Sequence, residues 1–390
     1  MANTIPSALA PLIMGEALEY LRNNNQFLAS LTMDYQTEAM EIGETINVGG
    51  APDLTAGNFT AANVAPSASD ITVPSKTITL DQHKVVEFSF SEADFRNNDL
   101  SSTFRQTIRS ATSAIVNNVN LALWNQYTKI PYAVGNSGTG FFASNIDGLA
   151  DVDKLLTQNK CPLENRMAML HLKDYAALLK IDNVQAANTY GGTEVMRRGV
   201  IQDVLGFMVM RDQQAPTHTI GTITGTVTAS AAAIGATSVT LTCATGEAVD
   251  LQDGDIVEFG DGNSYAAQGD VSIAAEAVGT ITLDRGLVAA LAGTEAIALA
   301  TTDSTYDASS LVQVAGDFKG IGCAARIPKT NVAGIDMQGT HFNFADPQTG
   351  WPMQLSFFGQ DGKVMIRLST IYGLQIMQSS RLVRILTTSS

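Results

Sequence analysis

Residues 101–129 read SSTFRQTIRSATSAIVNNVNLALWNQYTK, and this stretch decides the fold class. Large apolar residues recur in it at intervals of three or four, the spacing of one face of an α-helix. Such a helix is about 40 Å long at roughly 1.5 Å per residue. Pro131 ends it, because proline disfavours helical backbone at the residue before it. The predicted apolar face consists of Phe104, Ile108, Ala111, Ile115, Val119 and Leu123.

The sequence before this helix predicts an arm, a loop and a strand. Leucines at roughly helical intervals between residues 8 and 31 predict two short helices, separated at Asn23–Asn25. Residues 45–70 are rich in Gly, Ala, Asn, Thr and Pro and too poor in large apolar side chains to build a core. Residues 76–91 alternate as one long strand of about 50 Å, more than a small sheet needs. We therefore expect part of it to project as a hairpin arm.

The sequence after the helix predicts a mixed α+β domain. A loop over 135–145 precedes helix 149–158, strand 166–172 and helix 173–180, followed by an extended unit at 200–211. The pattern of this α+β domain is interrupted after residue 216 and resumes near Leu311. Residues 360–362, Gln-Asp-Gly, indicate a hairpin turn, and residues 381–386 a last strand.

Between these parts, residues 217–303 have nearly pure period-two patterning. Their only base is Arg285 against eleven acids, so this segment carries −10 of the chain's net charge of −15. Pro216 bounds it on one side and residues 303–309 on the other. We interpret the segment as an inserted β domain whose core includes Val239, Leu241, Ile256 and Phe259.

Charge and composition exclude several classes of function. A chain with 23 bases and 38 acids does not grip nucleic-acid phosphates along a basic face. Charged residues make up only 16% of the sequence, against about 25% in typical domains, which indicates a surface that contacts other protein. The three widely spaced cysteines predict buried thiols in a reducing compartment. We expect no signal peptide, because no base precedes Arg22 and Pro6, Pro11 and Gly15 interrupt the apolar start of the chain. We expect no membrane helix, because the long uncharged run 219–246 is rich in threonine.

No pattern of catalysis or cofactor binding stands out. There is no Gly-x-Ser-x-Gly elbow and no phosphate-binding loop, and the four histidines are far apart. Gly320–Ala325 matches a dinucleotide fingerprint, but Pro328 stands where its helix must run. The acids of residues 250–261, Asp255 among them, miss the spacing of a calcium loop and are interpreted as solvated turns. We predict no catalytic residue, no metal and no cofactor.

Two segments carry a more specific resemblance. They are GVIQDVLGFMVMRDQQAP at residues 199–216 and LQDGDIVEF at residues 251–259. With the order of elements above, they resemble the coat proteins of short-tailed phages, which are major capsid proteins of tailed bacteriophages with the Hong Kong 97 fold and an inserted β-barrel domain.

The resemblance implies an α+β fold in six parts. These are an N-terminal helical arm (1–44), an extended β-hairpin loop (45–84), a peripheral domain with the long helix as its spine (85–147), a first axial part (148–216), the inserted acidic β domain (217–305), and the second axial part with closing peripheral strands (306–390). The axial domain would combine residues 148–216 with 311–370.

The function implied is self-assembly into hexamers and pentamers of an icosahedral virion capsid. The shell would assemble in the host cytoplasm on a scaffolding protein, with a portal protein, and would enclose double-stranded DNA without sequence-specific binding or a membrane. Lys76 and Lys84 are the only lysines of the extended loop, and we expect non-covalent closure. The loop residues expected at subunit contacts are Phe59, Ile71, Val73 and Lys76.

Three alternatives remain open at this point. The first is a non-viral encapsulating shell protein of the same fold, against which the insertion weighs. The second is a carbohydrate-binding or adhesin-like module, favoured only by residues 217–303. The third is an enzyme, for which the sequence supplies no catalytic constellation.

Overall fold

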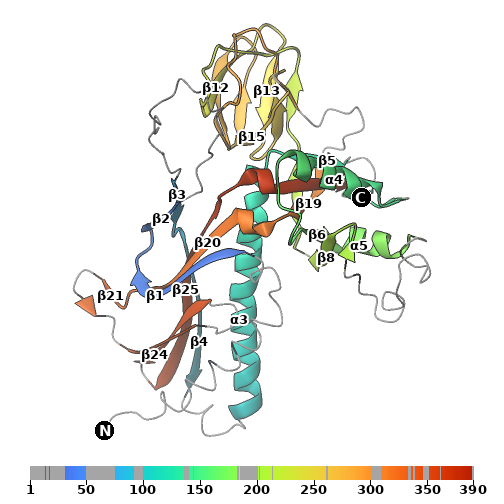
Figure 1. The fold of residues 1–390 in the computed structure, drawn as a ribbon. Coiled ribbons are helices and arrows are strands. Elements are labelled where there is room, and N and C mark those ends of the chain that lie inside the picture. The colour runs from blue at the N-terminus through green and yellow to red at the C-terminus, as the bar shows by residue number, and fades with distance from the viewer. Residues whose placement is uncertain are drawn as a thin grey trace, which may run out of the picture. The chain divides into compact units, whose positions relative to one another are not determined.

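We describe the fold from a computed structural model of the chain. It describes residues 14, 17, 31–49, 75–91, 100–135, 140–143, 145–181, 184, 201, 203–212, 214–260, 262–299, 309–332, 335–336, 339–345, 351–360 and 362–388. The chain divides into two compact units (Figure 1). The first comprises residues 1–119 and 321–377, and the second residues 120–320 and 378–390.

The first unit is built on a six-stranded sheet and most of the long helix α3 (Leu100–Trp124). The sheet order is β1-β20-β25-β24-β23, and β4 also pairs with β25. Only β1 is parallel to its neighbour. The strands are β1 (Thr32–Met40), β4 (Gln82–Ser91), β20 (Ile321–Pro328), β23 (Thr340–Ala345), β24 (Pro352–Gln360) and β25 (Lys363–Ile376). Two ribbons accompany it: β2 (Thr45–Gly49) with β3 (Ser75–Thr79), and β21 (Asn331–Val332) with β22 (Ile335–Asp336).

Alternation along β4 shows which face of this sheet is buried. Its even-numbered residues are half-buried, and its odd-numbered residues from His83 to Ser89 are exposed. Val86 and Phe88 stand opposite Leu368 and Ile366, which are buried, so these four residues share one face. The hydroxyl of Tyr372 on the same face donates a hydrogen bond of 3.4 Å to Asn118 O of α3. This apolar face of the sheet therefore looks toward the helix.

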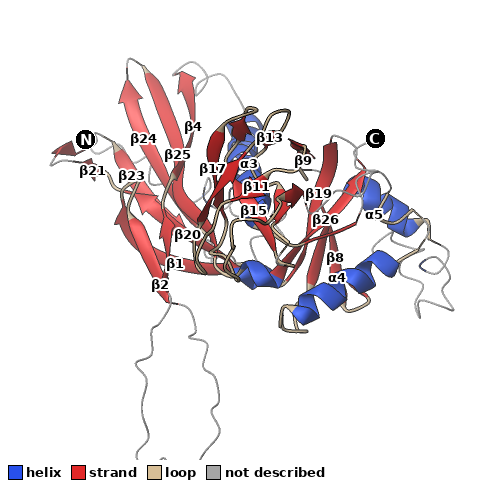
Figure 2. Cartoon of the chain, turned by 90° about the horizontal axis from the view of Figure 1, so that it is seen from above, coloured by secondary structure: helices blue, strands red, loops and turns tan. Residues whose placement is uncertain are grey.

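The second unit contains a seven-stranded sheet of order β5-β26-β19-β6-β8-β7, with β9 pairing β19. Helix α4 contacts β26 and β5, and helix α5 contacts β6 and β8 (Figure 2). The elements are the 3-10 turn η2 (Asn125–Lys129), β5 (Ala133–Gly135), α4 (Asp147–Gln158), β6 (Met167–His171), α5 (Leu172–Leu179), β7 (Asp203–Val204), β8 (Phe207–Asp212), β9 (Thr217–Thr219), β19 (Ser309–Gly316), η3 (Phe318–Gly320), η4 (Ser379–Arg381) and β26 (Leu382–Thr388).

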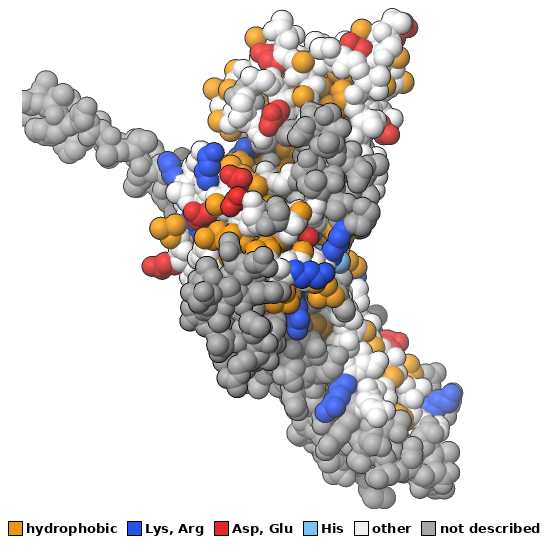
Figure 3. Space-filling view, turned by 90° about the vertical axis from the view of Figure 1, so that its right-hand side faces the viewer, with side chains coloured by type: hydrophobic (Ala, Val, Ile, Leu, Met, Phe, Trp, Pro, Cys, Tyr) orange, Lys and Arg blue, Asp and Glu red, His pale blue; other side chains and the backbone are white. Residues whose placement is uncertain are grey.

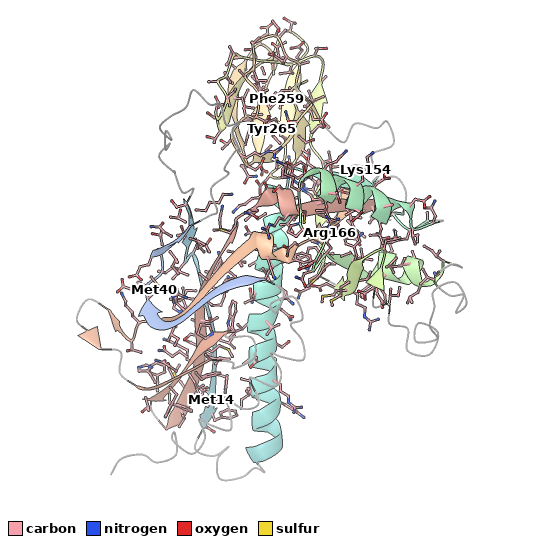
Figure 4. All side chains as sticks on the ribbon, in the orientation of Figure 1. Met14, Met40, Lys154, Arg166, Phe259 and Tyr265 are labelled. Atoms are coloured by element: carbon pink, nitrogen blue, oxygen red, sulfur yellow. The ribbon has the colours of Figure 1, made fainter. Side chains whose placement is uncertain are left out.

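Residues 220–299, here called the β module, form two further sheets in this unit. One has the order β10-β13-β16 and the other β11-β12-β17-β15-β14-β18. Their strands enclose an apolar cluster that includes Val239, Leu241, Phe259 and Tyr265; the last two are labelled in Figure 4. The strands are β10 (Thr222–Thr224), β11 (Thr228–Ala229), β12 (Ser238–Thr242), β13 (Ala248–Leu251), β14 (Ile256–Glu258), β15 (Ser264–Gln268), β16 (Val271–Ile273), β17 (Val278–Leu283) and β18 (Ala298–Leu299).

The chain enters and leaves the β module through neighbouring strands. β9 precedes the module and β19 follows it, and Thr219 pairs with Ser309 and Thr217 with Leu311. Thr217–Thr219 thus hydrogen-bonds to the seven-stranded sheet, here called the host sheet because it lies outside the module. The module boundary predicted at residue 217 is corrected accordingly. The module begins after Thr219.

Three other predictions are corrected by non-local pairing. Residues 76–91 form two strands, β3 and β4, with Leu80 and Asp81 between them. Residues 32–40 of the expected helical arm form β1, which pairs with β20, and the predicted helices of residues 8–31 lie largely outside the described residues. Residues 321–370 belong to the first unit with α3, because β25 pairs with β4 along ten residues, so they do not complete the axial domain.

Several local predictions agree with the structure. The long helix is present to Trp124 and continues as η2 to Lys129. Helices α4 and α5, strand β6 and the final strand β26 lie within a few residues of their predicted bounds. The hairpin at residues 360–362 joins β24 to β25, with Gln360 opposite Lys363 and Gly362 at φ +70°. All three cysteines are buried and free.

Candidate functional site

The base of the β2–β3 hairpin is the candidate assembly element of the first unit. Five residue pairs join its strands, from Thr45 with Thr79 to Gly49 with Ser75. Ile78 and Leu80 are fully buried and pack against Ala324 and Ile371 of the sheet. Met40, labelled in Figure 4, packs against the same cluster. The hairpin is thus anchored to the sheet at its base.

Polar contacts hold the same base. Lys76 Nζ donates to Ile376 O at 3.1 Å, and the Leu80 amide donates to Glu44 O at 2.9 Å. Lys329 Nζ lies 3.0 Å from Glu44 Oε1. This hydrogen bond lowers the pKa of Glu44 and raises the pKa of Lys329. Because both side chains reach solvent, the ion pair orients the base more than it stabilises the fold.

The structure describes only some of the residues predicted for the extended loop and for the buried face of the long helix. Phe59, Ile71 and Val73 lie outside the described residues, whereas Lys76 lies on β3. Phe104 lies on α3, but its side chain is outside the described set. Of the other residues named for this face, Ile108, Ile115 and Val119 are each 1% exposed, and Ala111 and Leu123 are buried as well. In the β module, Val239, Leu241, Ile256 and Phe259 are all buried.

A buried polar chain connects the host part of the second unit to the β module. Tyr127 Oη lies 3.1 Å from His218 Nδ1, and His218 Nε2 lies 2.9 Å from Asp255 Oδ1. The other carboxylate oxygen, Asp255 Oδ2, accepts from the amides of Gln252 at 2.8 Å and Gly221 at 3.0 Å. When Nε2 donates to Asp255, Nδ1 can accept from the Tyr127 hydroxyl, so each group in the chain has a partner. Burial raises the pKa of Tyr127, so that hydroxyl keeps its proton at neutral pH.

Arg384 of β26 reaches the same joint from the host side. The residue is 1% exposed, and its Nε and Nη1 each donate at 2.6 Å, to Ile130 O and Gly254 O respectively. Its guanidinium lies 5.5 Å from the centre of the Tyr127 ring. Burial lowers the pKa of Arg384 to about 10, so the group is still charged at pH 7. A buried cation thus binds the turn of the module that carries Asp255.

A basic side chain of the module also contacts the host part of this unit. Arg285, its one basic residue, donates to Tyr132 Oη of the host at 2.6 Å and to Ser264 O at 2.8 Å. The guanidinium lies between the rings of Tyr132 and Tyr265, at 5.0 and 5.3 Å from their centres. Together with the Arg384 contacts, these bonds fix the module on the segment that follows α3.

One glycine allows the close approach at this joint. Gly254 has φ +94°, and a Cβ there would lie 2.8 Å from Thr128 Cα. Both the backbone conformation and the contact exclude a side chain at this position. Beside it, Gln268 Nε2 donates to Thr128 O at 3.0 Å.

The interpretation of Asp255 as part of a solvated turn is wrong. The residue is 2% exposed, and its carboxylate binds three donors, His218 of β9, Gly221 at the start of the module and Gln252 of its own turn. Its sequence spacing gives no sign of this. Arg384 did carry a signal, since it is the only charged residue between Leu382 and Leu386, where an isolated charge in an apolar strand implies a buried partner.

A second buried carboxyl, on helix α5, is bonded to strands of the seven-stranded sheet. Asp174 of α5 is 1% exposed and accepts from Gln313 Nε2 of β19 and from Thr387 Oγ1 of β26. Gln313 Oε1 in turn accepts from the His171 amide at 3.0 Å. Burial raises the pKa of Asp174. The network ties α5 across three strands.

Within the described part of the chain, no three His, Cys, Asp or Glu residues are grouped so that they could hold a metal ion. Nor does any described helix combine the length and apolar character needed to cross a membrane.

Comparison with known proteins identifies the chain. The family model "P22 coat protein - gene protein 5" matches residues 55–318, more than half of the chain. The protein is thus of the phage capsid class, a major capsid protein that forms the shell. Within that class it belongs to the P22 coat protein family. This membership assigns the protein a structural role in the shell.

Solved capsid structures are also similar to the chain. A protein of Mycobacterium phage Che8 has 14% identity and a TM-score of 0.46, with 88% of this chain and 84% of that chain covered. The capsid of cyanophage P-SCSP1u has 11% identity and a TM-score of 0.48, covering 92% and 87%. The mature capsid of bacteriophage PhiM1 has 10% identity and a TM-score of 0.47, covering 94% and 88%. No curated protein matches the sequence.

Proposed function

We propose that this coat protein closes into an icosahedral shell of hexamers and pentamers around the double-stranded DNA genome of a tailed phage. The match of residues 55–318 to the coat protein family is the observation that carries the proposal. The net charge of −15 supports it, since an acidic shell encloses DNA without adhering to it.

We propose that residues 45–84 act as the arm between neighbouring copies. The buried Ile78 and Leu80 hold the base of the β2–β3 hairpin, while Ser75, Lys76, Thr77 and Thr79 of β3 are exposed. Phe59, Ile71, Val73 and Lys76 are the contact residues in this proposal. Many weak contacts of this kind add up across a lattice.

We propose that residues 220–299 are a domain inserted into the axial part and placed on the outside of the shell. The pairing of β9 with β19 supports the insertion, because it keeps the entry and exit points side by side. Acidic side chains are spread over the module among uncharged ones (Figure 3). On the inside they would repel the packaged genome, so the outer surface is the favourable location.

Assembly in the host cytoplasm on a scaffolding protein, with a portal protein at one vertex, completes the proposal. It is tested by expressing the full chain alone and together with the products of the flanking genes. Sedimentation and negative-stain microscopy should show closed particles in the co-expression, with non-covalent closure seen as release of single chains in denaturant. A chain that stays monomeric at high concentration in both cases would contradict the proposal.

Substitution in the arm separates assembly from folding. Phe59→Asp should abolish particles and leave the circular dichroism and melting of the subunit unchanged. Subunits that fail to fold would contradict the assignment of this segment as an arm between copies.

A further inference from the structure

The β2–β3 hairpin rests on the backbone of a glycine in the sheet below it. Gly373 of β25 stands opposite Ala324 of β20. A Cβ at Gly373 would lie 2.1 Å from Thr79 O and 2.8 Å from Thr79 C, at distances that real Cβ atoms do not reach. The last residue of β3 therefore lies directly on this strand, without a side chain between the two backbones.

The neighbouring glycine on the same face makes a different kind of contact. A Cβ at Gly322 would meet Met377 Cγ at 2.9 Å and Ile78 Cδ1 at 3.1 Å. Both are side-chain atoms and can turn away. Thr79 O cannot, because it belongs to the backbone of β3. Of the two glycines, Gly373 is therefore the one that sets the distance between the hairpin and the sheet, here called the height of the hairpin.

The contacts around Thr79 hold the hairpin at that height. Ile78 and Leu80, on either side of it, are buried. Lys76 Nζ is bonded to Ile376 O, three residues beyond Gly373. Only Leu80 and Asp81 separate β3 from β4, whose first residue Gln82 pairs with Tyr372. The hairpin is thus tied to β25 on both sides of the Gly373 contact.

We propose that Gly373 is the positioning residue of the extended arm: its lack of a side chain sets the height and direction at which the hairpin leaves the sheet, and so the geometry with which copies join. This proposal rests on the proposed function of the hairpin as an arm between copies. A Cβ at Gly373 needs about 1 Å of movement of β3 to reach van der Waals distance. Residues 50–74 of the chain lie between β2 and β3, so a tilt at the base of the hairpin displaces this whole segment.

A graded alanine series tests the proposal in the full-length protein. Gly373→Ala introduces the backbone clash and Gly322→Ala the side-chain contact. Gly359→Ala, in β24 of the same sheet, is the matched control, because a Cβ there meets no atom within 4 Å. Each variant is co-expressed with the flanking gene products. The readouts are the diameter and uniformity of particles by microscopy and the melting of the unassembled subunit.

Gly359→Ala should give particles of wild-type diameter, and Gly322→Ala nearly so. Gly373→Ala should fold and melt cooperatively but give particles of altered diameter, open sheets or none. Wild-type particles from Gly373→Ala would overturn the proposal. If wild-type chain itself forms no particle, the proposed function fails instead.

A second variant decides the matter if Gly373→Ala does not fold. Lys329→Met removes the ion pair with Glu44 that orients the base of the hairpin, and Lys329 is not one of the proposed contact residues. It should fold and give a broader distribution of particle diameters than wild type. A distribution as narrow as that of wild type would overturn the proposal.

Discussion

His218 Nε2 lies 2.9 Å from Asp255 Oδ1, and the two residues are 6% and 2% exposed. His218 belongs to β9 of the host sheet, and Asp255 to the turn before β14 of the module. A carboxylate at this depth is stable only if hydrogen bonds replace its lost water. The amides of Gly221 and Gln252 supply the other two. The bond is therefore a main link between the module and its host.

Asp255→Asn should destabilise the protein by about 1–3 kcal/mol. An amide accepts at one atom only, so its NH₂ group must face a donor that the carboxylate now binds. Unfolding in denaturant measures the loss. Asp250→Asn is the matched control, because Asp250 is exposed on β13 of the same module and should change stability by less than about 0.5 kcal/mol. Equal losses would show that net charge, rather than these bonds, is responsible.

Arg384→Met should be strongly destabilising, at about 1–3 kcal/mol for each acceptor left without a donor. The acceptors are Ile130 O and Gly254 O, both bonded to the guanidinium at 2.6 Å. Arg381→Met is the comparison. Arg381 is partly exposed, so its ion pair with Asp317 should contribute less to the free energy of unfolding than the buried bonds of Arg384. Denaturant midpoints of both variants check the order. A larger effect at Arg381 would contradict this account of the joint.

The sequence correctly predicted those elements that depend on contacts between residues close together in the chain. The period of α3 was readable because its buried residues recur at helical intervals from Ile108 through Ile115 to Leu123. The turn before β25 was readable because Gly362 needs a positive φ. The fingerprint match at residues 320–325 shows the limit of such patterns. Gly320 ends the 3-10 turn η3 and Gly322 lies in strand β20, so no helix begins at these glycines.

Non-local contacts explain what the sequence did not reveal. The alternation of residues 76–91 continues in phase across Leu80 and Asp81, so nothing local marks the end of β3. The break exists because Ile78 and Leu80 pack on Ala324 and Ile371, whereas β4 pairs along β25. The bonds of Asp255 to Gly221 and His218 likewise join residues 34 and 37 positions apart. Single-sequence spacing carries no information on such pairs.

Asp174→Asn should stabilise the protein at neutral pH. Burial raises the pKa of Asp174 in the fold, so the folded state holds its proton more tightly than the unfolded chain. Stability from this group is then greatest below the unfolded value of about 4 and is lost as pH rises toward the folded pKa. An asparagine can still accept from Gln313 and can donate to Thr387, without a charge to desolvate.

Denaturant unfolding between pH 4 and 8 measures this effect. The variant should lose less stability than wild type as pH rises. Asp151→Asn, on the exposed side of α4, is the control and should leave the pH profile unchanged. A variant less stable than wild type at pH 7 would show that the ionised carboxylate is needed by the network.

Ile115→Ala should cost about 2–5 kcal/mol, the range for removing a large buried side chain from a core. Ile115 is 1% exposed on α3. Leu121→Ala in the same helix removes a side chain that is 48% exposed and should cost much less. Denaturant unfolding of the two unassembled subunits compares them. Similar losses would contradict the assignment of the buried face.

Residues 220–299 should fold when expressed alone. Both sheets and the apolar cluster between them lie within this segment, and β10 and β18 near its two ends are in contact. The fragment should give a strand-type circular dichroism spectrum and a cooperative melt. Ten acids against Arg285 give it a net charge of −9, which should keep it soluble and away from DNA.

The fragment should melt below the module in the intact chain, because excision removes Tyr127, Tyr132 and Arg384 from the joint. The converse chain, with a short Gly/Ser linker from Thr219 to Ser309, keeps the β9–β19 pairing but leaves Arg384 without Gly254 O and His218 without Asp255. It should therefore be less stable than wild type even though its own sheet is complete. A fragment that stays unfolded, or a shortened host as stable as the full chain, would show that the joint does not couple the two folds.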